Sequence, residues 1–353
     1  MINTDQYVPI LKCKEGEFQA LKRLDSSIKS FIVPIVDLVR NKQKKLDPHI
    51  LSSIGYILKH WSPERLLFID GYMIQEDGVL QNGMHPIEYI FNELLSKRFN
   101  VLPSISNITG LDYNAAIKSV CQEVQKGVCI RIFRRPTNQI NFEIDRLLNY
   151  LELSPIEVDL VIDLRSLEDI GSNELSQWCS QELNNLNYLA EWRSFVISGG
   201  SFPVDLTELK QDQIHLIDRK EWMNWKRLVE RKEVERIPVY SDYAISHPLM
   251  SPFEGIPNAS ASIRYTQENE FYVYRGKGTR QYSFDQFYDL SESLINSEEY
   301  YGQDHCDGEK FIHICGTKKE KPGSLTTWRW VGTVHHLTVV TNQLRQFFRD
   351  FNA

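Results

Sequence analysis

The chain has 353 residues, a length that fits one α/β barrel of about 250 residues with an appended piece of about 100 residues. Hydrophobic residues make up 42% and charged residues 25%, so the composition is that of a packed globular protein and not of a disordered one. The net charge of −7 argues against broad, non-specific nucleic-acid binding, which needs a basic surface, although a local basic site remains compatible with it.

Targeting and membrane signals are missing from the sequence. The N-terminal stretch MINTDQYVPILKCKEGE has no apolar core of the signal-peptide kind, and no apolar run reaches the roughly 18 residues that a membrane span needs. The six cysteines are scattered without CxxC pairs. We therefore expect a reduced, cytoplasmic location and no membrane partner.

Short apolar segments recur along the first 248 residues and predict eight strands. They are Tyr7–Lys12, Phe31–Asp37, Arg65–Asp70, Asn100–Ser106, Gly127–Arg134, Val158–Leu164, Arg193–Gly200 and Ile237–Ile245. Between them, amphipathic patterns predict helices at Glu17–Leu24, His49–His60, Pro86–Lys97, Tyr113–Gln125, Asn141–Leu151, Ser172–Leu189 and Leu216–Glu233. A proline inside a central strand cannot donate to the ladder, so we expect a bulge or distortion at Pro34.

This alternation predicts the fold class. Near-continuous apolar strands that alternate with amphipathic helices are typical of parallel strands covered on both sides. Eight such units predict an α/β protein whose residues 1–248 form a (β/α)8 TIM-barrel-like domain. A doubly wound open sheet is the alternative. Such a sheet usually carries a Gly-rich phosphate fingerprint after its first strand, and the segment KCKEGE at residues 12–17 is not one.

The pattern changes after Pro248. Residues 249–353 predict an appended C-terminal α+β segment that packs over the barrel mouth, and residues 249–260 are rich in Pro, Gly and Ser, which predicts a loop. The elements expected beyond this loop are a hairpin of Ser262–Thr266 and Glu270–Gly276, helices at Phe284–Ser297 and Gln343–Phe351, and strands at Lys310–Cys315 and Val334–Val340.

Charged residues stand at the carboxyl ends of the predicted strands, where barrels of this type place their active sites. Candidates for catalytic roles are Lys12, Asp37, Asp70, Asp163 and Asp242. Turn formation and capping explain any single aspartate. Four at one mouth repel one another unless cations or a divalent metal are present. Two alternatives stay open: a structural ion network, with Lys12 and Arg131 each facing an aspartate, and a substrate site.

Other residues suit ligand binding. The candidates are Arg131, Gly199, Gly200, Ser201, Tyr243, Arg264, Tyr265, Arg275, Arg329 and His335. The glycines after the seventh strand would let backbone N–H groups approach a phosphate, although a tight turn explains them equally. Arg beside Tyr suits anion recognition with stacking, whereas aromatic alternation on a hairpin more often reflects packing. Neighbouring His335 and His336 on a strand would point to opposite faces, so at most one would reach a site.

Three further patterns carry less information. The pairs His305/Cys306 and His313/Cys315 suggest zinc, but their spacing matches no standard finger. Cys13 lies between two lysines, which could lower its pKa and make it a nucleophile. The motifs GxSxG, HExxH and GxxxxGK[ST] are absent from the sequence.

Several segments together resemble the Beta protein family of bacterial prophages and mobile islands. They are YVPILKCKEGEFQAL (Tyr7–Leu21), GGSFP (Gly199–Pro203), SDY (Ser241–Tyr243), RYT with RG (Arg264–Thr266 and Arg275–Gly276) and TWRWVGTVHHLTVV (Thr327–Val340). The resemblance spans nearly the whole chain and implies an accessory gene of phages or genomic islands, with phage–host conflict and antiviral defence as its setting. It transfers no catalytic role. In relatives the second strand often ends in Glu. Asp37 stands at this position here, which keeps the negative charge but gives a shorter side chain.

The leading hypothesis is a metal-assisted enzyme of the hydrolase type that acts on a phosphorylated ligand, a nucleotide or a nucleic-acid end. Phosphate would be held by Arg131, Gly200, Arg264 and Arg275. The four aspartates would bind Mg²⁺ or Mn²⁺ or supply a general base, and Lys12 would neutralise developing charge. The Trp328–His336 stretch would fold over the mouth. Convergence of the four aspartates would favour this hypothesis, and their pairing with Arg or Lys would argue against the metal.

The main alternative is a non-catalytic recognition protein of phage defence or counter-defence. Its C-terminal surface would bind a partner protein encoded in the same locus. A barrel scaffold within a larger complex is a third interpretation.

Overall fold

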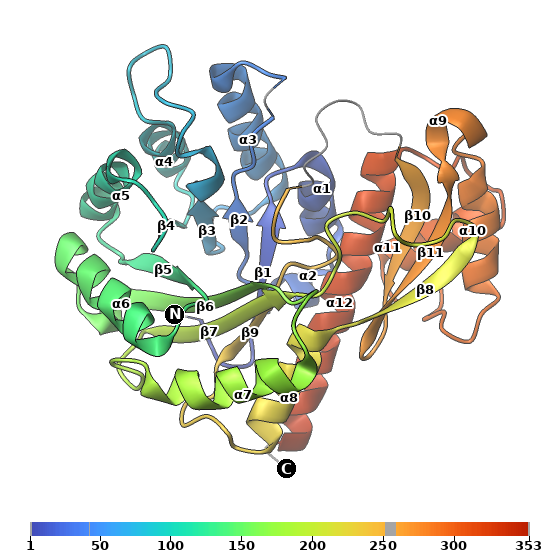
Figure 1. Ribbon diagram of the computed structural model, residues 1–353. Coiled ribbons are helices and arrows are strands. Elements are labelled where there is room, and N and C mark those ends of the chain that lie inside the picture. The colour runs from blue at the N-terminus through green and yellow to red at the C-terminus, as the bar shows by residue number, and fades with distance from the viewer. Residues whose placement is uncertain (1, 42, 251–258, 352–353) are drawn as a thin grey trace.

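Eight parallel strands close into a barrel at the centre of the computed structural model, which describes residues 2–41, 43–250 and 259–351 (Figure 1). In barrel order they are β1 (Tyr7–Lys12), β2 (Ile35–Asp37), β3 (Leu67–Asp70), β4 (Val101–Ser106), β5 (Val128–Phe133), β6 (Val158–Ser166), β7 (Ser194–Gly200) and β9 (Val239–Asp242). The barrel closes where β9 pairs with β1, with Tyr240 opposite Tyr7. Each barrel strand coincides with one of the eight predicted segments, so the TIM-barrel-like fold is confirmed.

Helices surround the barrel. They are α1 (Glu15–Arg23), α2 (Ser26–Lys29), α3 (Leu46–His60), α4 (Pro86–Ser96), α5 (Leu111–Val124), α6 (Thr137–Leu151), α7 (Ser172–Glu182) and α8 (Lys220–Glu230), with 3₁₀ turns η1 (Tyr72–Ile74), η2 (Pro155–Glu157) and η3 (Leu183–Asn185). The predicted helix at Leu216–Glu233 is wrong at its start. Residues 213–218 form strand β8 (Gln213–Asp218), because they pair with a strand of the C-terminal part.

Side-chain alternation divides each barrel strand between two cores. Along β1, Val8 and Ile10 point into the barrel, where they meet Phe68 and other apolar side chains. Leu11 of the same strand belongs to the larger core between the strands and the helices. The positions at the carboxyl end of the barrel interior are instead polar and buried. The apolar interior therefore ends below a polar layer at the mouth.

The strand that contains Pro34 is shortened as expected. Strand β2 begins only at Ile35, while an isolated bridge joins Ile32 to Tyr7. The register is the same on both sides of the interruption, because Ile32 pairs with Tyr7 and Ile35 pairs with Ile10. The distortion is thus a local break in the ladder without a bulge.

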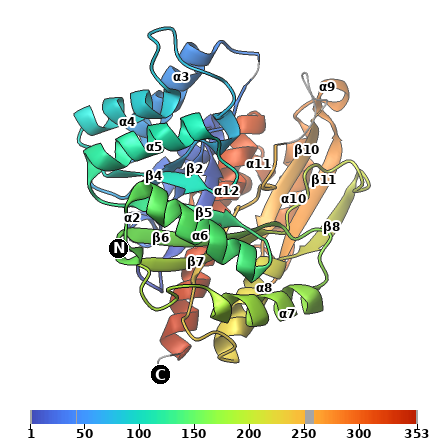
Figure 2. The same ribbon diagram turned by 60° about the vertical axis from the view of Figure 1, so that its left-hand side comes forward.

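The C-terminal part builds a second sheet beside the barrel, as both views show (Figure 2). Its strand order is β10 (Ser260–Thr266), β11 (Glu270–Gly278) and β8, and all its pairs are antiparallel. The predicted hairpin is confirmed. The sheet meets the barrel through Phe271 and Val273, which pack on Phe202 and Ile245 beyond the ends of β7 and β9. That the extension covers the mouth itself stays a prediction, and most of the predicted 249–260 loop lies outside the described residues.

Four helices complete the chain: α9 (Thr279–Tyr282), α10 (Gln286–Ile295), α11 (Asp307–Gly316) and α12 (Leu325–Phe351). The strands expected at Lys310–Cys315 and Val334–Val340 are therefore wrong, since both segments are helical. The middle of α12 is buried on all sides between α1, α11 and β10, so its β-branched, apolar sequence carries no amphipathic pattern. Within the described ranges, no helix is both long and apolar enough to span a bilayer.

Glycines let α12 approach its neighbours closely. A Cβ on Gly332 of α12 would lie 2.8 Å from Cδ1 of Ile245 and 2.9 Å from the Arg264 carbonyl oxygen. A Cβ on Gly308 of α11 would lie 2.6 Å from the Val331 carbonyl oxygen, and one on Gly16 of α1 would lie 2.6 Å from Cγ of Arg329. Each of the three surfaces that contact α12 thus meets it where a glycine stands.

Replacing Gly332 by alanine should destabilise the protein although alanine is the better helix former. The new methyl group would collide with backbone that has no room to move, and such overpacking costs about 1–3 kcal/mol. Gly55 in α3 is the matched control, because nothing lies within 4 Å of its added Cβ and Gly55→Ala should stabilise by up to about 1 kcal/mol. Urea unfolding of both variants measures the free energies. Equal effects of the two substitutions would contradict the close-contact explanation.

Candidate functional site

The guanidinium of Arg131 lies at the centre of the barrel mouth with no exposure to solvent. Its Nε donates to Oδ2 of Asp163 at 2.8 Å, and its Nη1 donates to Oδ1 of Asp37 at 2.7 Å and to Oδ2 of Asp70 at 3.1 Å. Its Nη2 donates to the Tyr243 hydroxyl at 2.6 Å. We call Arg131, Asp37, Asp70, Asp163 and Tyr243 the arginine ring. Lys12 and Arg131 were each expected to face an aspartate: Arg131 does, whereas Lys12 donates to the Leu249 carbonyl oxygen and the expectation for it is wrong. These contacts also remove Arg131 from the phosphate-binding candidates.

One guanidinium cannot neutralise three buried carboxylates. Burial, together with the nearby charges of Asp70 and Asp163, raises the pKa of Asp37 to about 6 against the opposing effect of Arg131. Oδ2 of Asp37 is buried and has no hydrogen-bond partner among the described residues, so it is the oxygen that can carry a proton. Both oxygens of Asp70 are used, since Oδ1 accepts the Tyr72 N–H at 3.0 Å and Oδ2 also accepts the Ser104 hydroxyl at 2.9 Å.

The arginine ring does not suit a divalent metal. The guanidinium occupies the space between the carboxylates that a cation would need, and Asp70 and Asp163 already use both of their oxygens as hydrogen-bond acceptors. Across the described part of the chain, no group of three or more His, Cys, Asp or Glu side chains is arranged to hold a metal ion. The hypothesis of a Mg²⁺ or Mn²⁺ site built from the strand-end aspartates therefore fails, and so does a zinc site at His305/Cys306 or His313/Cys315.

Asp242 is separated from the other three aspartates. It lies on the outer face of β9, while its neighbour Tyr243 points into the barrel, since successive side chains of a strand alternate. Its carboxylate accepts from the Tyr7 hydroxyl, the Tyr240 hydroxyl at 2.9 Å and Nε2 of His336 at 3.0 Å. Burial opposes ionisation, but these partners hold the pKa of Asp242 at about 2. The expectation of four aspartates at one mouth is wrong.

The two adjacent histidines lie in α12, not in a strand, and both are buried. Nδ1 of His335 lies 2.8 Å from Oε1 of Glu309, and its Nε2 lies 2.8 Å from the Thr266 carbonyl oxygen. Burial opposes a charge on His335, but the nearby charge of Glu309 raises the pKa of His335 to about 9, so the imidazole is protonated near neutral pH. Tyr265 stacks on this imidazolium at 4.0 Å. His335 and Tyr265 are thus placed in a buried packing network away from the mouth.

Packing accounts for the two glycines at the end of β7, Gly199 and Gly200. A Cβ on Gly199 would lie 2.9 Å from Cδ1 of Leu167, and one on Gly200 would lie 3.2 Å from Cδ2 of Tyr243. The Ser201 hydroxyl donates to Glu221 in the first turn of α8 and accepts the Lys220 N–H at 3.0 Å. A carboxyl group at this helix start takes the place that a phosphate would occupy, so the turn gives no support to the anion cradle.

The arginines of the C-terminal part take different positions. Arg264 donates to the Ile245 carbonyl oxygen at 2.6 Å and lies 4.4 Å from the Phe202 ring centroid. Arg329 donates to the Ser246 hydroxyl at 3.0 Å, and its Nε lies 3.9 Å from Oε1 of Glu17. Arg275 of β11 makes no ion pair with the described residues and lies on the second sheet. The structure does not bring Arg264 and Arg275 to Arg131.

Cys13 is not an activated thiol. It is buried beside the Ser53 carbonyl oxygen at 3.9 Å, and burial raises its pKa to about 12. Lys12 points to the opposite face, into the barrel mouth, since successive side chains of β1 alternate. The nucleophile interpretation of Cys13 is therefore wrong.

Two cations at the mouth have no ion pair with the described residues. Lys12 is 8% exposed, and its Nζ donates to the Leu249 carbonyl oxygen at 2.7 Å. Burial, and then the charges of Lys14 and Arg329, lower the pKa of Lys12 to about 7. Arg165 is half-buried, and its guanidinium carbon lies 4.5 Å from the Phe133 ring centroid and 5.7 Å from that of Tyr72. We call Lys12 and Arg165 the mouth cations.

His247 lies with the mouth cations. Its Nδ1 accepts the Leu249 N–H at 3.0 Å, and burial lowers its pKa, with the charges of Lys12 and Arg165 adding to the effect. Its Nε2 lies 4.0 Å from Oε2 of Glu168. Sequence reasoning missed Arg165 and His247. Strand alternation gave no signal for Arg165, because the ladder of β6 is irregular between Asp163 and Ser166 and Arg165 has a φ of 57°.

Several buried polar atoms at the inner mouth have no partner in the described residues. They are Oδ2 of Asp37, the hydroxyl of Tyr72, and the hydroxyls of Ser106, Ser198 and Ser241. Buried polar groups are nearly always hydrogen-bonded to protein or to ordered water. The inner mouth is thus built for water or for the polar atoms of a ligand.

The sequence model of the Beta protein family matches residues 7–342. The chain belongs to the Beta protein family. This match includes the barrel and nearly all of the C-terminal part, and it confirms the resemblance found in the sequence. No curated protein matches the chain.

One similar solved structure is the catalytic module of a family 98 glycoside hydrolase from Streptococcus pneumoniae TIGR4, in complex with the H-disaccharide blood group antigen. The identity is 10% and the TM-score 0.38, and the match covers 71% of this chain and 49% of that chain. This member of the Beta protein family thus spans about half the length of that module, and no statement about its site follows from the similarity.

Protonation of Asp37 should give the protein a measurable pH dependence. The folded pKa of about 6 exceeds the unfolded value of about 3.9, so the stabilisation is fully present below about pH 4 and is lost as the pH rises through about 6. Asp37→Asn cannot titrate. The unfolding free energy of Asp37→Asn minus that of wild type should therefore rise by about 2–3 kcal/mol between about pH 4 and pH 7.

Chemical denaturation across this pH range measures the difference. Substitution of the exposed Asp169 by asparagine serves as the control and should leave the profile of wild type unchanged. A difference that is constant with pH, or that falls, would show that Asp37 keeps an ordinary pKa within the arginine ring.

Proposed function

We propose that the barrel mouth binds a phosphorylated ligand through the two mouth cations, Lys12 and Arg165. One observation carries the proposal: the described residues give neither cation an ion pair, whereas Arg131 directly below has three. Cations that are largely removed from water need an anionic partner, and a phosphate supplies several acceptor oxygens.

The two side chains suit a phosphate in complementary ways. Arg165 lies over Phe133, which fixes the plane of its guanidinium and leaves its N–H groups free for two oxygens. Lys12 offers a compact charge at the carboxyl end of β1. The arginine ring holds more negative than positive charge, so it repels an anion from the barrel interior. A phosphate would therefore be held at the level of the mouth cations.

The backbone at Arg165 supports a positioned side chain. Its φ of 57° lies in the left-handed region, which non-glycine residues rarely adopt. The conformation is held because the Arg165 N–H donates to Oδ1 of Asp163 at 2.8 Å. The arginine ring thus directs Arg165 through the same carboxylate that binds Arg131.

Groups that can move protons lie in the same place. Lys12 has a pKa of about 7 and Asp37 a pKa of about 6, so both change charge near neutral pH. A metal-independent phosphoester hydrolysis is the reaction that these groups would serve. The alternative, a non-catalytic recognition protein, uses the same binding site without turnover. Phosphate release from a panel of phosphomonoesters separates the two, because a recognition protein binds them and releases none.

Ligand binding should depend on the mouth cations and not on Asp242. We expect inorganic phosphate and sulfate to raise the melting temperature of wild type and to have little effect on Arg165→Ala or Lys12→Met. Asp242→Ala is the control for a buried charge outside the barrel. It should lower the melting temperature, because four donors lose their acceptor, while the shift caused by the anions persists. Loss of the shift in Asp242→Ala alone would contradict the proposal.

The pH dependence of anion binding tests Lys12 separately. Sulfate keeps its charge between about pH 6 and 9, whereas Lys12 loses its proton as the pH rises through about 7. Sulfate affinity should therefore fall over this range in wild type and change little in Lys12→Arg, whose guanidinium stays charged. Titration calorimetry at several pH values gives the affinities. An equal decline in both proteins would assign the pH dependence to another group.

The phage-associated or phage-defence setting is part of the proposal and rests on the family resemblance. If the mouth acts on a ligand of infected cells, expression of the wild-type chain should lower plaque counts of a sensitive phage on a bacterial host. Arg165→Ala, expressed at the same level, should lose this protection. Equal plaque counts for the wild type, the variant and an empty vector across a phage panel would remove the defence setting.

A further inference from the structure

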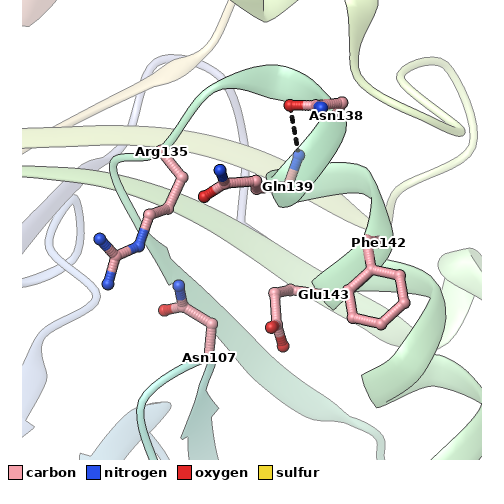
Figure 3. A pocket seen from close by; sticks show the side chains of 6 residues that line it. All are labelled: Asn107, Arg135, Asn138, Gln139, Phe142 and Glu143. Carbon is pink, nitrogen blue, oxygen red and sulfur yellow. Dashed lines mark hydrogen bonds between the residues drawn. The ribbon is translucent and has the colours of Figure 1, made fainter.

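We propose that a groove beside the mouth binds the base of a nucleotide whose phosphate is held by Lys12 and Arg165. This inference rests on the proposed function and names its ligand as a nucleoside phosphate. The groove has a volume of about 450 Å³, within the usual range of small-molecule sites. It is lined by Asn107, Arg135, Asn138, Gln139, Phe142 and Glu143 (Figure 3).

The groove lies on the same face of the barrel as the mouth cations. Asn107 directly follows β4, Arg135 follows β5, and the other lining residues belong to the first turns of α6. Oδ1 of Asn107 accepts the Phe133 N–H at 3.0 Å. Phe133 is also the ring on which Arg165 lies, at 4.5 Å. Phe133 therefore contacts both the groove residue Asn107 and the side chain of Arg165. The groove and Arg165 are thus adjacent, as the binding of one molecule to both requires.

The lining suits a planar polar ring. Phe142 is 66% exposed, and its ring stands at one side of the groove, across from Asn107 and Arg135 (Figure 3). An exposed aromatic ring beside a groove is a stacking surface, and every nucleobase presents a π face to it. Stacking would also cover the apolar surface that Phe142 leaves in contact with water.

Amide groups supply the hydrogen bonds that the edge of a base needs. Asn138 uses its Oδ1 to accept the Gln139 N–H at 2.9 Å, so its NH₂ group is left as a donor. The side-chain amide of Gln139 makes no hydrogen bond to the described residues, and Nδ2 of Asn107 is also without one. Asn and Gln present a donor and an acceptor side by side, the arrangement that reads base edges.

Charge favours the mouth over the groove as the place of the phosphate. Arg135 is the one cation among the lining residues, since the lining anion Glu143 is already paired with Arg146, whose Nε lies 2.8 Å away. The groove thus offers a single positive charge, whereas the mouth offers two, Lys12 and Arg165. Phosphate is expected at the mouth cations and the base in the groove.

Titration calorimetry with a defined panel tests this inference. The probes are inorganic phosphate, ribose 5-phosphate, four nucleosides (adenosine, guanosine, cytidine and uridine) and their 5′-monophosphates. In wild type, at least one nucleoside monophosphate should bind about tenfold more tightly than ribose 5-phosphate, as stacking on one aromatic ring provides. Phe142→Ala should remove this advantage and leave the affinity for ribose 5-phosphate unchanged. Phe142→Tyr should retain it.

Ile156→Ala is the matched control. Ile156 is 61% exposed and lies in η2 at the opposite, amino-terminal end of β6, so its truncation should change no affinity. Because Phe142 is itself exposed, its variants should keep the melting temperature of wild type, which confirms that affinity changes arise in the groove.

The outcomes separate this inference from the proposed function. If ribose 5-phosphate binds and Arg165→Ala abolishes its binding, but no nucleoside monophosphate binds more tightly, the base site is overturned and the phosphate site stands. The base site is likewise overturned if the advantage of a monophosphate survives in Phe142→Ala. If nucleosides bind through Phe142 while phosphate and ribose 5-phosphate do not, the groove stands and the mouth site fails. Absence of binding by every probe overturns both.

Discussion

The ion cluster around Arg131 is the interaction on which the rest of this structure depends. A single guanidinium joins side chains from β2, β3 and β6, and Tyr243 directly after β9, to its own strand, β5, and thereby ties five of the eight barrel strands together at their carboxyl ends. Removing one partner of such a buried cluster leaves charges that nothing compensates, which typically costs about 3–5 kcal/mol, the scale measured for buried ion pairs. The cluster thus fixes the shape of the mouth, and it also decides its chemistry.

That chemistry follows from an imbalance of charge. Three carboxylates surround one guanidinium, so the cluster favours a proton on Asp37, excludes anions from the interior and leaves no place for a metal ion. The residues able to meet a ligand are therefore those one layer further out, at Lys12 and Arg165. Asp163 connects the two layers, because one oxygen accepts from Arg131 and the other holds the backbone of Arg165.

The barrel could be predicted from the sequence because each strand is an apolar run bounded by turns, and eight such runs recur. The mouth could be predicted only in part. Lys12, Asp37, Asp70, Asp163 and Arg131 come together because all are at inward positions of strand ends. Asp242 does not join them, since strand register decides which of two neighbouring residues faces inward, and Ser241 and Tyr243 take those positions in β9. A set of strand-end residues read from the sequence lacks this information.

The wrong secondary-structure predictions for the C-terminal part have a different physical origin. Residues 334–340 of α12 are rich in Val, Thr and Leu, which indicates a strand when local preference alone is considered. The helix is buried from all sides, so tertiary contacts override that preference and no polar face marks it as a helix. Strand β8 was missed for a related reason: it forms through pairing with β11, a partner that lies more than fifty residues later in the chain. Both α12 and β8 thus depend on contacts with residues that are distant in the sequence.

The position of α12 has a consequence for how the protein is made. The Tyr7 hydroxyl contacts Nε2 of His336 at 3.1 Å, so the seam between the first and last barrel strands is covered by residues 329 positions apart. The same helix supplies His336, one of the groups that hydrogen-bond to the buried carboxylate of Asp242. During synthesis, residues up to His336 must leave the ribosome before α12 can cover this seam. Contacts of such long range form late and slowly, so the nascent barrel exists for a time without α12.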